Sequence, residues 1–568
     1  MKYRNNIHYV GALVVFFYVI IGTNILWAQT ATNTKPKLVV GIVVDQMRFD
    51  YLYKYESKYG EGGFKRIMRE GFNFKNTQFN YVPTVTAAGH ASIYTGTTPS
   101  SHGIIGNSWY DRKAAQIVSN VGDDKVIIVG SQQPDSIGLS PNNLLTTTIG
   151  DQLRLASNFK SKVISVSLKD RGAIIPGGHT ANAAYWHSWQ TSPGYFVSSS
   201  YYMDQVPSWV NRFNKQEKTD AYLNETWETL YPIEDYTESA PDNNPYESLL
   251  RGQGSTPTFP YDFKSIRESR RESGTEYHLI WASPLGNTLL TEFALEAIKN
   301  EELGKDEATD LINISYSVPD IIGHTFGPQS VELQDTYLRL DKDIEQLLLS
   351  LDNDIGQGNY VVFLTSDHGV MPTASYAEAN KMPAGIAALH IYSIALNNFL
   401  NDKYGNGEWV EIFNYENVYL NKKLIKEKKV DLRNIRQATA DFLITQPGIV
   451  LALTADHLRN NYYDSGLAHR IQNGYHPMRS GDVVLNFLPG YVQNATPGMK
   501  PSLVRGTTHG SGYAYDTHVP MVWMGKGIPH GESVREVSIT DVAPTLAMFL
   551  NLQLPNGSSG KPLKELFD

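Results

Sequence analysis

Six apolar runs rich in β-branched residues recur along the 568-residue chain, with helical patterns between several of them. The first run, KLVVGIVV, is uninterrupted, as expected for a strand that is buried on both faces of a sheet. Strands that alternate with helices favour a parallel sheet with helices on both sides. We therefore predict an α/β fold with a mostly parallel central sheet flanked by helices. The runs cover residues 37–44, 162–168, 311–318, 359–366, 482–488 and 519–525.

The N-terminus has the pattern of a secretory signal. Lys2 and Arg4 precede a short apolar run at 10–21, and a polar segment follows Ala28. We expect residues 1–28 to be a signal peptide, residues 29–36 a linker, and the mature protein to be periplasmic or secreted without a stable membrane anchor. An uncleaved anchor is the alternative. The apolar run falls short of the roughly 20 residues that a membrane span needs, but Leu26 is not the small residue usual before a cut.

The composition limits the chemistry of the chain. The net charge is −9, so we expect no nucleic-acid partner. The chain has no cysteine, which excludes disulfides and thiolate nucleophiles and leaves Asp, Glu, His and hydroxyl groups as metal ligands. Within a catalytic domain at 37–568, two segments interrupt the strand–helix alternation. We expect both, at about 173–285 and 371–480, to be insertions that form a cap, although the many aromatic residues of the first are also typical of core packing.

Carboxylate and imidazole groups gather at the ends of the apolar runs. In open α/β sheets, ligands bind outside the carboxyl ends of the strands. Asp320 and His324 are four residues apart, so one helical turn would point both side chains the same way. A lone Asp–His pair is more often a cap or a turn, but the joint pattern predicts a two-metal site, and mixed carboxylate and imidazole ligands suit Zn²⁺. The candidate ligands are Asp45, Asp320, His324, Asp367, His368 and His509.

The segment TVTAAGHASIYTG contains the candidate nucleophiles, which are Thr84, Thr86 and Ser92. It has the pattern of a helix that begins near Thr86, and a helix N-terminus attracts anions such as phosphate. A metal-activated Thr86 hydroxyl there would be placed to attack phosphorus. The alternative is that Thr86 only caps the helix, which is the usual role of threonine at such a position. The residues alone favour the cap.

These motifs resemble those of the alkaline phosphatase superfamily, and in particular its type I phosphodiesterase/nucleotide pyrophosphatase branch. The resemblance runs from Lys37 to Asp568. It covers a T-x-x-x-H nucleophile motif, a following TG…P…HGI…N pattern, the PDxxGHxxG and SDHG metal motifs, a last histidine and the C-terminal tail. The matching residues are Thr86–His90, Thr95–Gly96, Pro99, His102–Ile104, Asn107, Pro319–Gly327, Ser366–Gly369, His509 and 541–563.

The chain is most similar to the threonine-nucleophile, phosphate-irrepressible alkaline phosphatases, whose Lys-x-Arg pair matches Lys169 and Arg171. The resemblance implies hydrolysis of small-molecule phosphate monoesters through a phospho-threonine at Thr86, and we expect a monomer. It implies two Zn²⁺ per chain. Asp320, His324 and His509 would hold one ion, and Asp45, Thr86, Asp367 and His368 the other. Asn107, Lys169 and Arg171 would bind the phosphoryl oxygens.

Three other functions stay open at this point. A nucleotide pyrophosphatase/phosphodiesterase would use the same metal ligands and nucleophile. A sulfatase needs a Cys or Ser within a C/S-x-P-x-R motif. The chain has no Cys, and no such Ser motif occurs near Thr86. A non-enzymatic binding protein would give no reason for a complete set of ligands and a nucleophile.

Overall fold

The computed structural model describes residues 35–132, 137–190, 193–493 and 499–567. The chain divides into two units, residues 1–36 and 37–568, and the second holds all the elements described below. The predicted signal peptide lies outside the described residues, as does most of the predicted linker. None of the helices in the described ranges combines the length and the apolar character that a membrane crossing requires.

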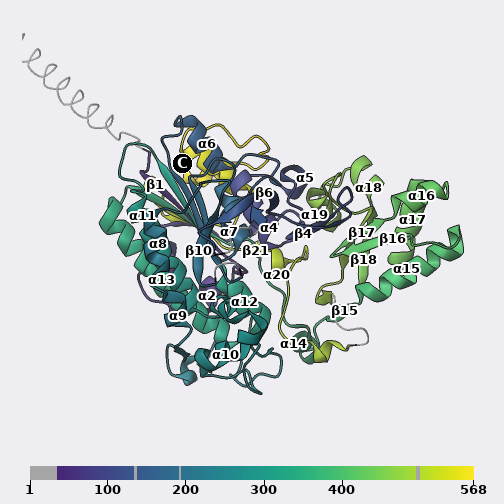
Figure 1. Cartoon of the computed structure of the whole chain (residues 1–568), viewed down its shortest axis with the longest axis horizontal. Helices are drawn as coiled ribbons and strands as arrows, with labels where there is room; N and C mark the ends of the chain where they lie inside the picture. Colours follow the sequence, from purple (N-terminus) through teal and green to yellow (C-terminus); the bar gives the residue numbers. More distant parts are fainter. Residues whose placement is uncertain (1–34, 133–136, 191–192, 494–498, 568) are drawn as a thin grey trace, which may run out of the picture. The chain divides into compact units, whose positions relative to one another are not determined.

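An 11-stranded mixed sheet forms the centre of the second unit (Figure 1). Five adjacent strands in its middle are parallel, and antiparallel pairings extend the sheet on both sides. The predicted α/β class and its parallel sheet are therefore confirmed for the centre of the sheet. The parallel strands are, in spatial order, β14 (Tyr360–Thr365), β1 (Leu38–Val44), β13 (Asp310–Tyr316), β8 (Val163–Ser167) and β9 (Ala183–Ser188). The outer strands are β23 (Gly531–Ser533), β2 (Phe72–Phe74), β22 (Met521–Gly525), β10 (Tyr195–Ser199), β6 (Gly122–Val129) and β7 (Ile137–Leu139).

Strand β1 is buried on both faces, as its uninterrupted apolar sequence predicts. Val40 and Ile42 pack in one hydrophobic cluster with residues of α11 (Leu285–Asn300) and α13 (Val331–Leu351). Val39 and Val43 point to the opposite face and pack with residues of α4 (Thr86–Thr95) and α21 (Val542–Phe549). Helices therefore cover both faces of the sheet, and the parallel strands expose only their ends.

A second, antiparallel sheet lies outside the central one. It contains β16 (Val410–Asn414), β17 (Asn417–Leu420), β19 (Val483–Phe487) and β18 (Ile449–Thr454). It packs with α15 (Leu389–Tyr404) and α17 (Leu432–Leu443) around a core of its own. The run 482–488, which we predicted for the central sheet, forms β19 here, because an apolar run does not show which strands it will pair with.

Part of the aromatic segment at 173–285, predicted as an insertion, belongs to the central sheet. Its strands β9 and β10 extend the central sheet, and Tyr185, Trp186 and Phe196 are buried there. These aromatics therefore pack in the core rather than in a cap. The boundaries of both insertions stay predictions.

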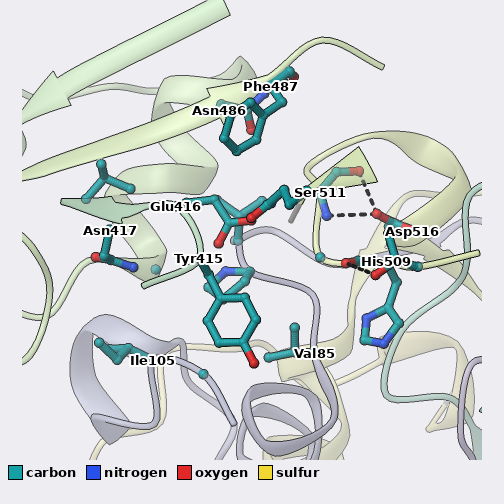
Figure 2. A pocket seen from close by; sticks show the side chains of 18 of the residues that line it. Val85, Ile105, Tyr415, Glu416, Asn417, Asn486, Phe487, His509, Ser511 and Asp516 are labelled. Atoms are coloured by element: carbon teal, nitrogen blue, oxygen red, sulfur yellow. Dashed lines mark hydrogen bonds between the residues drawn. The ribbon is translucent and has the colours of Figure 1, made fainter. Parts of the chain in front are cut away.

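A pocket lies where the second sheet meets the carboxyl ends of the central strands (Figure 2). Asn417 and Asn486 of the second sheet line this pocket. Val85, which directly precedes α4, lines it as well. The pocket therefore opens beside the residues that carry the predicted chemistry.

Candidate metal and phosphate site

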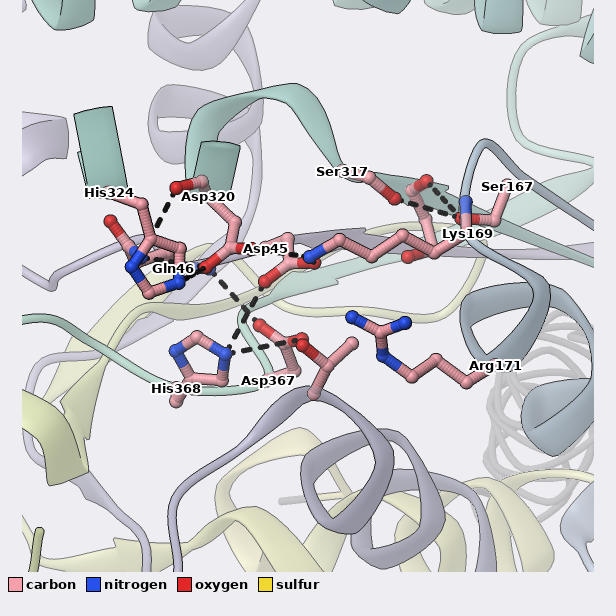
Figure 3. Close-up of polar contacts among 12 residues, drawn as sticks. Asp45, Gln46, Ser167, Lys169, Arg171, Ser317, Asp320, His324, Asp367 and His368 are labelled. Carbon is pink, nitrogen blue, oxygen red and sulfur yellow. Dashed lines mark hydrogen bonds and ion pairs between the residues drawn. The ribbon is translucent and has the colours of Figure 1, made fainter. Parts of the chain in front are cut away.

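The carboxyl ends of three adjacent parallel strands bring four predicted ligands together (Figure 3). Asp45 follows β1, Asp367 and His368 follow β14, and Asp320 lies in α12 (Val318–Phe326), directly after β13. All four side chains are buried. The register explains their proximity, because β1 pairs in parallel with both β13 and β14.

The two other predicted ligands join this cluster. Nε2 of His324 lies 3.1 Å from Oδ1 of Asp320, and Nε2 of His509 lies 3.5 Å from the same oxygen. Two groups have ligand atoms within 4.8 Å of one another, namely Asp320, His368 and His509, and Asp45, Asp367 and His368. His368 thus adjoins both groups, whereas the family resemblance assigns it to one ion. His324 reaches the first group through Asp320.

Backbone carbonyls orient all three imidazoles. Nδ1 of His324 bonds the carbonyl of Thr507 at 2.8 Å, and Nδ1 of His509 bonds that of Thr84 at 2.8 Å. Nδ1 of His368 bonds the carbonyl of Gly369 at 2.9 Å. A carbonyl only accepts, so each Nδ1 carries a proton and Nε2 is the nitrogen left for other partners. This is the usual arrangement around metal-binding histidines.

The cluster contains buried polar atoms that nothing within the described residues satisfies. Oδ1 of Asp45, Oδ2 of Asp367 and Nε2 of His368 have no hydrogen-bond partner there. Burial, followed by the charge of Asp45, raises the pKa of Asp367 well above its usual value. Unpaired buried acceptors and crowded carboxylates are costly unless a cation compensates them. These donors therefore fit divalent metal ions.

Lys169 connects the two carboxylates that the resemblance assigns to different ions. It holds the position directly before α7 (Asp170–Gly177), after β8, and its Nζ lies 2.6 Å from Oδ2 of Asp45 and 2.5 Å from Oδ2 of Asp320. Burial raises the pKa of Asp320, but the charges of Lys169 and His324 outweigh it and hold that pKa well below its usual value. Burial lowers the pKa of Lys169, and the charges of Asp320 and Asp45 outweigh that effect as well, so the ammonium stays charged.

Thr86 is the first residue of α4 and is only 1% exposed. Val85, not Thr86, holds the N-cap position and offers no side-chain acceptor. The free backbone N–H of Ala87 at the helix start donates instead to Oδ1 of Asn107 at 3.0 Å. This bond orients the Asn107 amide so that its NH₂ group remains available for another acceptor. The structure therefore does not support the reading of Thr86 as a simple N-cap.

The other two candidate nucleophiles have partners of their own. The Thr84 hydroxyl donates to the carbonyl of Ser511 at 2.9 Å, and the Ser92 hydroxyl pairs with Nε2 of His102 at 3.0 Å. Arg171 lies in α7, and its guanidinium points toward Asp367 (Figure 3). Its buried Nε has no hydrogen-bond partner among the described residues. The geometry thus singles out Thr86 and brings Arg171 to the same cluster.

The sequence analysis assigned no role to two positioning residues, Gln46 and His90. Gln46 donates from its backbone N–H to Oδ1 of Asp367 at 3.2 Å and from Nε2 to Oδ1 of Asp320 at 2.7 Å. Its φ of +66° is unusual for a residue with a side chain, which suggests that the site imposes this conformation. His90 bonds the carbonyl of Thr86 and the hydroxyl of Ser315, each at 2.8 Å. The T-x-x-x-H spacing pointed to His90 without giving it a role.

The fold and the cluster define an α/β protein with a metal site at the carboxyl ends of its parallel strands. The chain belongs to the type I phosphodiesterase/nucleotide pyrophosphatase family, whose model matches residues 39–512. The family resemblance seen in the motifs is therefore confirmed.

Three relatives illustrate this membership. Alkaline phosphatase PhoV from Synechococcus elongatus is 44% identical over 535 residues, which cover 94% of each chain. Alkaline phosphatase PafA from Elizabethkingia meningoseptica is 41% identical over 552 residues, covering 96% of this chain and 98% of that one. A crystal structure of PafA matches 94% of this chain and 99% of that chain with a TM-score of 0.86. A Myroides odoratus protein named calcium-transporting ATPase is 42% identical over 538 residues, which are 94% of this chain and 95% of that one.

Proposed function

We propose that this protein is a metal-dependent alkaline phosphatase that hydrolyses phosphate monoesters through Thr86. The Thr86 oxygen attacks phosphorus, the bond to the ester oxygen breaks, and the leaving alcohol takes up a proton. A water oxygen then attacks the phospho-threonine, the bond from phosphorus to Thr86 breaks, and the threonine hydroxyl is restored. The observation that carries this proposal is the position of Thr86, which is buried at the start of α4. Its carbonyl bonds Nδ1 of His90, and that nitrogen lies 3.4 Å from Oδ2 of Asp367 in the cluster.

The residues that would hold two zinc ions are those that the family resemblance gives. Their donors fit, because several are buried and unpaired among the described residues. Bound ions would neutralise charge on the attacking and leaving oxygens, which is the main requirement of phosphoryl transfer. The ligands are Asp320, His324 and His509 for one ion and Asp45, Asp367, His368 and Thr86 for the other.

Three polar groups favour a monoester over a diester. A monoester dianion carries more charge on its nonbridging oxygens than a diester anion does. The charged Lys169, the guanidinium of Arg171 and the free NH₂ of Asn107 all serve such oxygens as donors. A diesterase that used the same metal ligands would instead need a place for a second ester group.

Further properties belong to the same proposal. We expect export to the periplasm or medium, a monomer, and no anchor after signal cleavage. The name of the Myroides relative refers to an ATPase. The site we describe would also account for release of the terminal phosphate of ATP, because that phosphate has three free oxygens like a monoester.

A trapping experiment tests the nucleophile. The metal-loaded protein is mixed with an aryl phosphate, quenched in acid and digested, and its peptides are analysed by mass spectrometry. We expect phosphate on Thr86, and loss of both label and turnover in Thr86→Ala. Thr84→Ala is the matched control and should keep both, because the Thr84 hydroxyl is bound to Ser511. Full turnover by Thr86→Ala would overturn the proposal.

A further inference from the structure

The pocket beside the cluster has a volume of about 260 Å³. This is close to the lower end of the roughly 300–1,000 Å³ typical of small-molecule sites. His324, His509 and Asn107 of the predicted site are among its lining residues. Asn417 and Asn486 of the second sheet line it as well (Figure 2). A group attached to a phosphate at Thr86 therefore has this pocket directly beside it.

Tyr415 occupies an unusual position at the edge of this pocket. It is the first residue of the two-residue turn between β16 and β17, and its φ is +51°. Backbone in this region favours glycine, and a bulky side chain there is uncommon. The ring points toward Val85, the residue before the nucleophile (Figure 2). Tyr415 is 45% exposed and, among the residues that the structure describes, its side chain makes no hydrogen bond or ring contact.

The Tyr415 side chain therefore does not explain its own strained backbone. Within the described part of the chain it neither fills a core nor forms a hydrogen bond, and glycine would suit the turn better. A strained residue that persists beside a reactive group is a candidate for function. An exposed aromatic ring facing a pocket provides a stacking surface for a planar group.

Three side chains of the pocket lining, those of Glu416, Gln493 and Asp516, offer acceptor oxygens. Nε2 of Gln493 donates to Oε1 of Glu416, and burial raises the pKa of Glu416. Oε1 of Gln493 and Oδ1 of Asp516 are buried and have no partner among the described residues. Acceptors and carboxyl groups disfavour a second anionic group here and suit a neutral one with N–H or O–H donors.

We propose that this pocket binds the leaving group of the substrate, and that it selects a neutral, planar aromatic group with N–H or O–H donors, the chemistry of a nucleoside. The inference deepens the proposed phosphatase function and rests on it. Tyr415 provides the stacking surface, and Glu416, Gln493 and Asp516 provide the acceptors.

The test compares two primary alkyl monoesters, adenosine 5′-monophosphate and ethyl phosphate, so that the reacting atoms are alike. In the metal-loaded Tyr415→Ala variant we expect kcat/KM for adenosine 5′-monophosphate to fall about tenfold, the order that loss of one base–aromatic stack gives. The value for ethyl phosphate should stay within about twofold, because that substrate makes no stack to lose. Tyr415→Phe keeps the ring and should retain most of the preference.

Tyr415→Gly separates this role from a structural one. Glycine relieves the backbone conformation, so the melting temperature should stay or rise, while the preference for adenosine 5′-monophosphate should fall as in Tyr415→Ala. A lower melting temperature with equal losses on both substrates would show that Tyr415 is structural and would overturn the inference.

Inhibition by adenosine keeps this test separate from the proposed function. Adenosine should compete with ethyl phosphate in the wild type and not in Tyr415→Ala. If the wild type hydrolyses neither ester, the phosphatase proposal fails, and adenosine binding by calorimetry still tests the pocket. If both esters are hydrolysed with no preference that depends on Tyr415, only the leaving-group inference fails.

Discussion

The Nζ atom of Lys169 lies 2.6 Å from Oδ2 of Asp45. The same ammonium lies 2.5 Å from Asp320, so one cation reaches carboxylates that the family resemblance assigns to different metal ions. A residue in this position lies between the two sites and is close to any phosphoryl group that bridges them. We therefore propose that the substrate preference of the protein depends strongly on this one lysine.

Substitution of Lys169 is the first prediction. Lys169→Ala should lower kcat/KM for an aryl phosphate by about 10²–10³, the usual cost of removing one preorganised donor from a transition state. The loss for a methyl aryl diester should be smaller, because that substrate has less charge for the ammonium to meet. Lys160→Ala, which removes an exposed lysine, is the control and should change neither rate. Equal losses on the two esters would contradict the role of Lys169 in selecting monoesters.

Metal removal is the second prediction. Chelation should abolish turnover and lower the melting temperature, because it leaves Oδ1 of Asp45 and Oδ2 of Asp367 buried with no hydrogen-bond partner among the described residues. Zinc should restore both, and elemental analysis should find two ions per chain. His368 adjoins both groups of ligands, so His368→Ala should lose more metal than His324→Ala, which adjoins the groups only through Asp320. Equal metal loss in the two variants would contradict this geometry.

Much of the fold was predictable because the signals are local. The uninterrupted apolar run at β1 predicts a doubly buried strand, and the structure confirms it. The apolar spacing at 330–351 predicts a helix, which forms α13 with Ser330 as its N-cap. The positions of Asp45 and Asp367 at strand ends follow from the sheet and from the general rule for ligand sites in α/β proteins.

Other features depend on long-range contacts that no local pattern reports. Strand β19 has the sequence of a central strand but pairs with β17 and β18 in the second sheet. Gln46 follows Asp45 in the chain without any motif, and its role appears only when α12 and the end of β14 lie beside it. The family resemblance proposed phosphate contacts for Lys169 but did not predict its contacts with the two carboxylates.

The close approach of α4 to the Asp367 loop gives the third prediction. A methyl group at Gly89 would overlap the carbonyl oxygen of Asp367. Alanine normally stabilises a helix relative to glycine by about 0.5–1 kcal/mol, so a destabilised Gly89→Ala variant would report the overlap. We expect at least a tenfold lower kcat, because displacement of α4 misplaces Thr86 relative to its metal ligands. Unchanged kcat and metal content in this variant would show that the contact tolerates a methyl group.

Asp343 gives the fourth prediction, which concerns stability and pH. This buried carboxyl in α13 is bonded by Thr288 at 3.3 Å, and burial raises its pKa to about 8. Between the unfolded value of about 3.9 and this raised value, the folded state binds more protons than the unfolded state, so the free energy of unfolding falls as pH rises. Asp343→Asn has no carboxyl group to titrate, so this fall in the free energy of unfolding is absent from the variant. Its stability relative to the wild type should increase by about 1–3 kcal/mol from pH 5 to pH 9.

The measurement for Asp343 is denaturant unfolding of both proteins at each pH with zinc held constant. The pH dependence of metal binding is shared by the two proteins, so it cancels in their difference. Asp354→Asn, which changes an exposed carboxylate near the end of the same helix, is the control. A difference between wild type and Asp343→Asn that does not change with pH would show that this carboxyl does not titrate in the folded protein as described.

The most direct test of the proposed function is the ratio of kcat/KM for an aryl phosphate to that for its methyl diester, measured on the metal-loaded wild type. If Lys169, Arg171 and Asn107 bind charged nonbridging oxygens as proposed, the monoester is hydrolysed faster by at least about tenfold, the effect of roughly one selective polar contact. Faster hydrolysis of the diester would contradict the account and would identify a phosphodiesterase that uses the same metals and the same threonine.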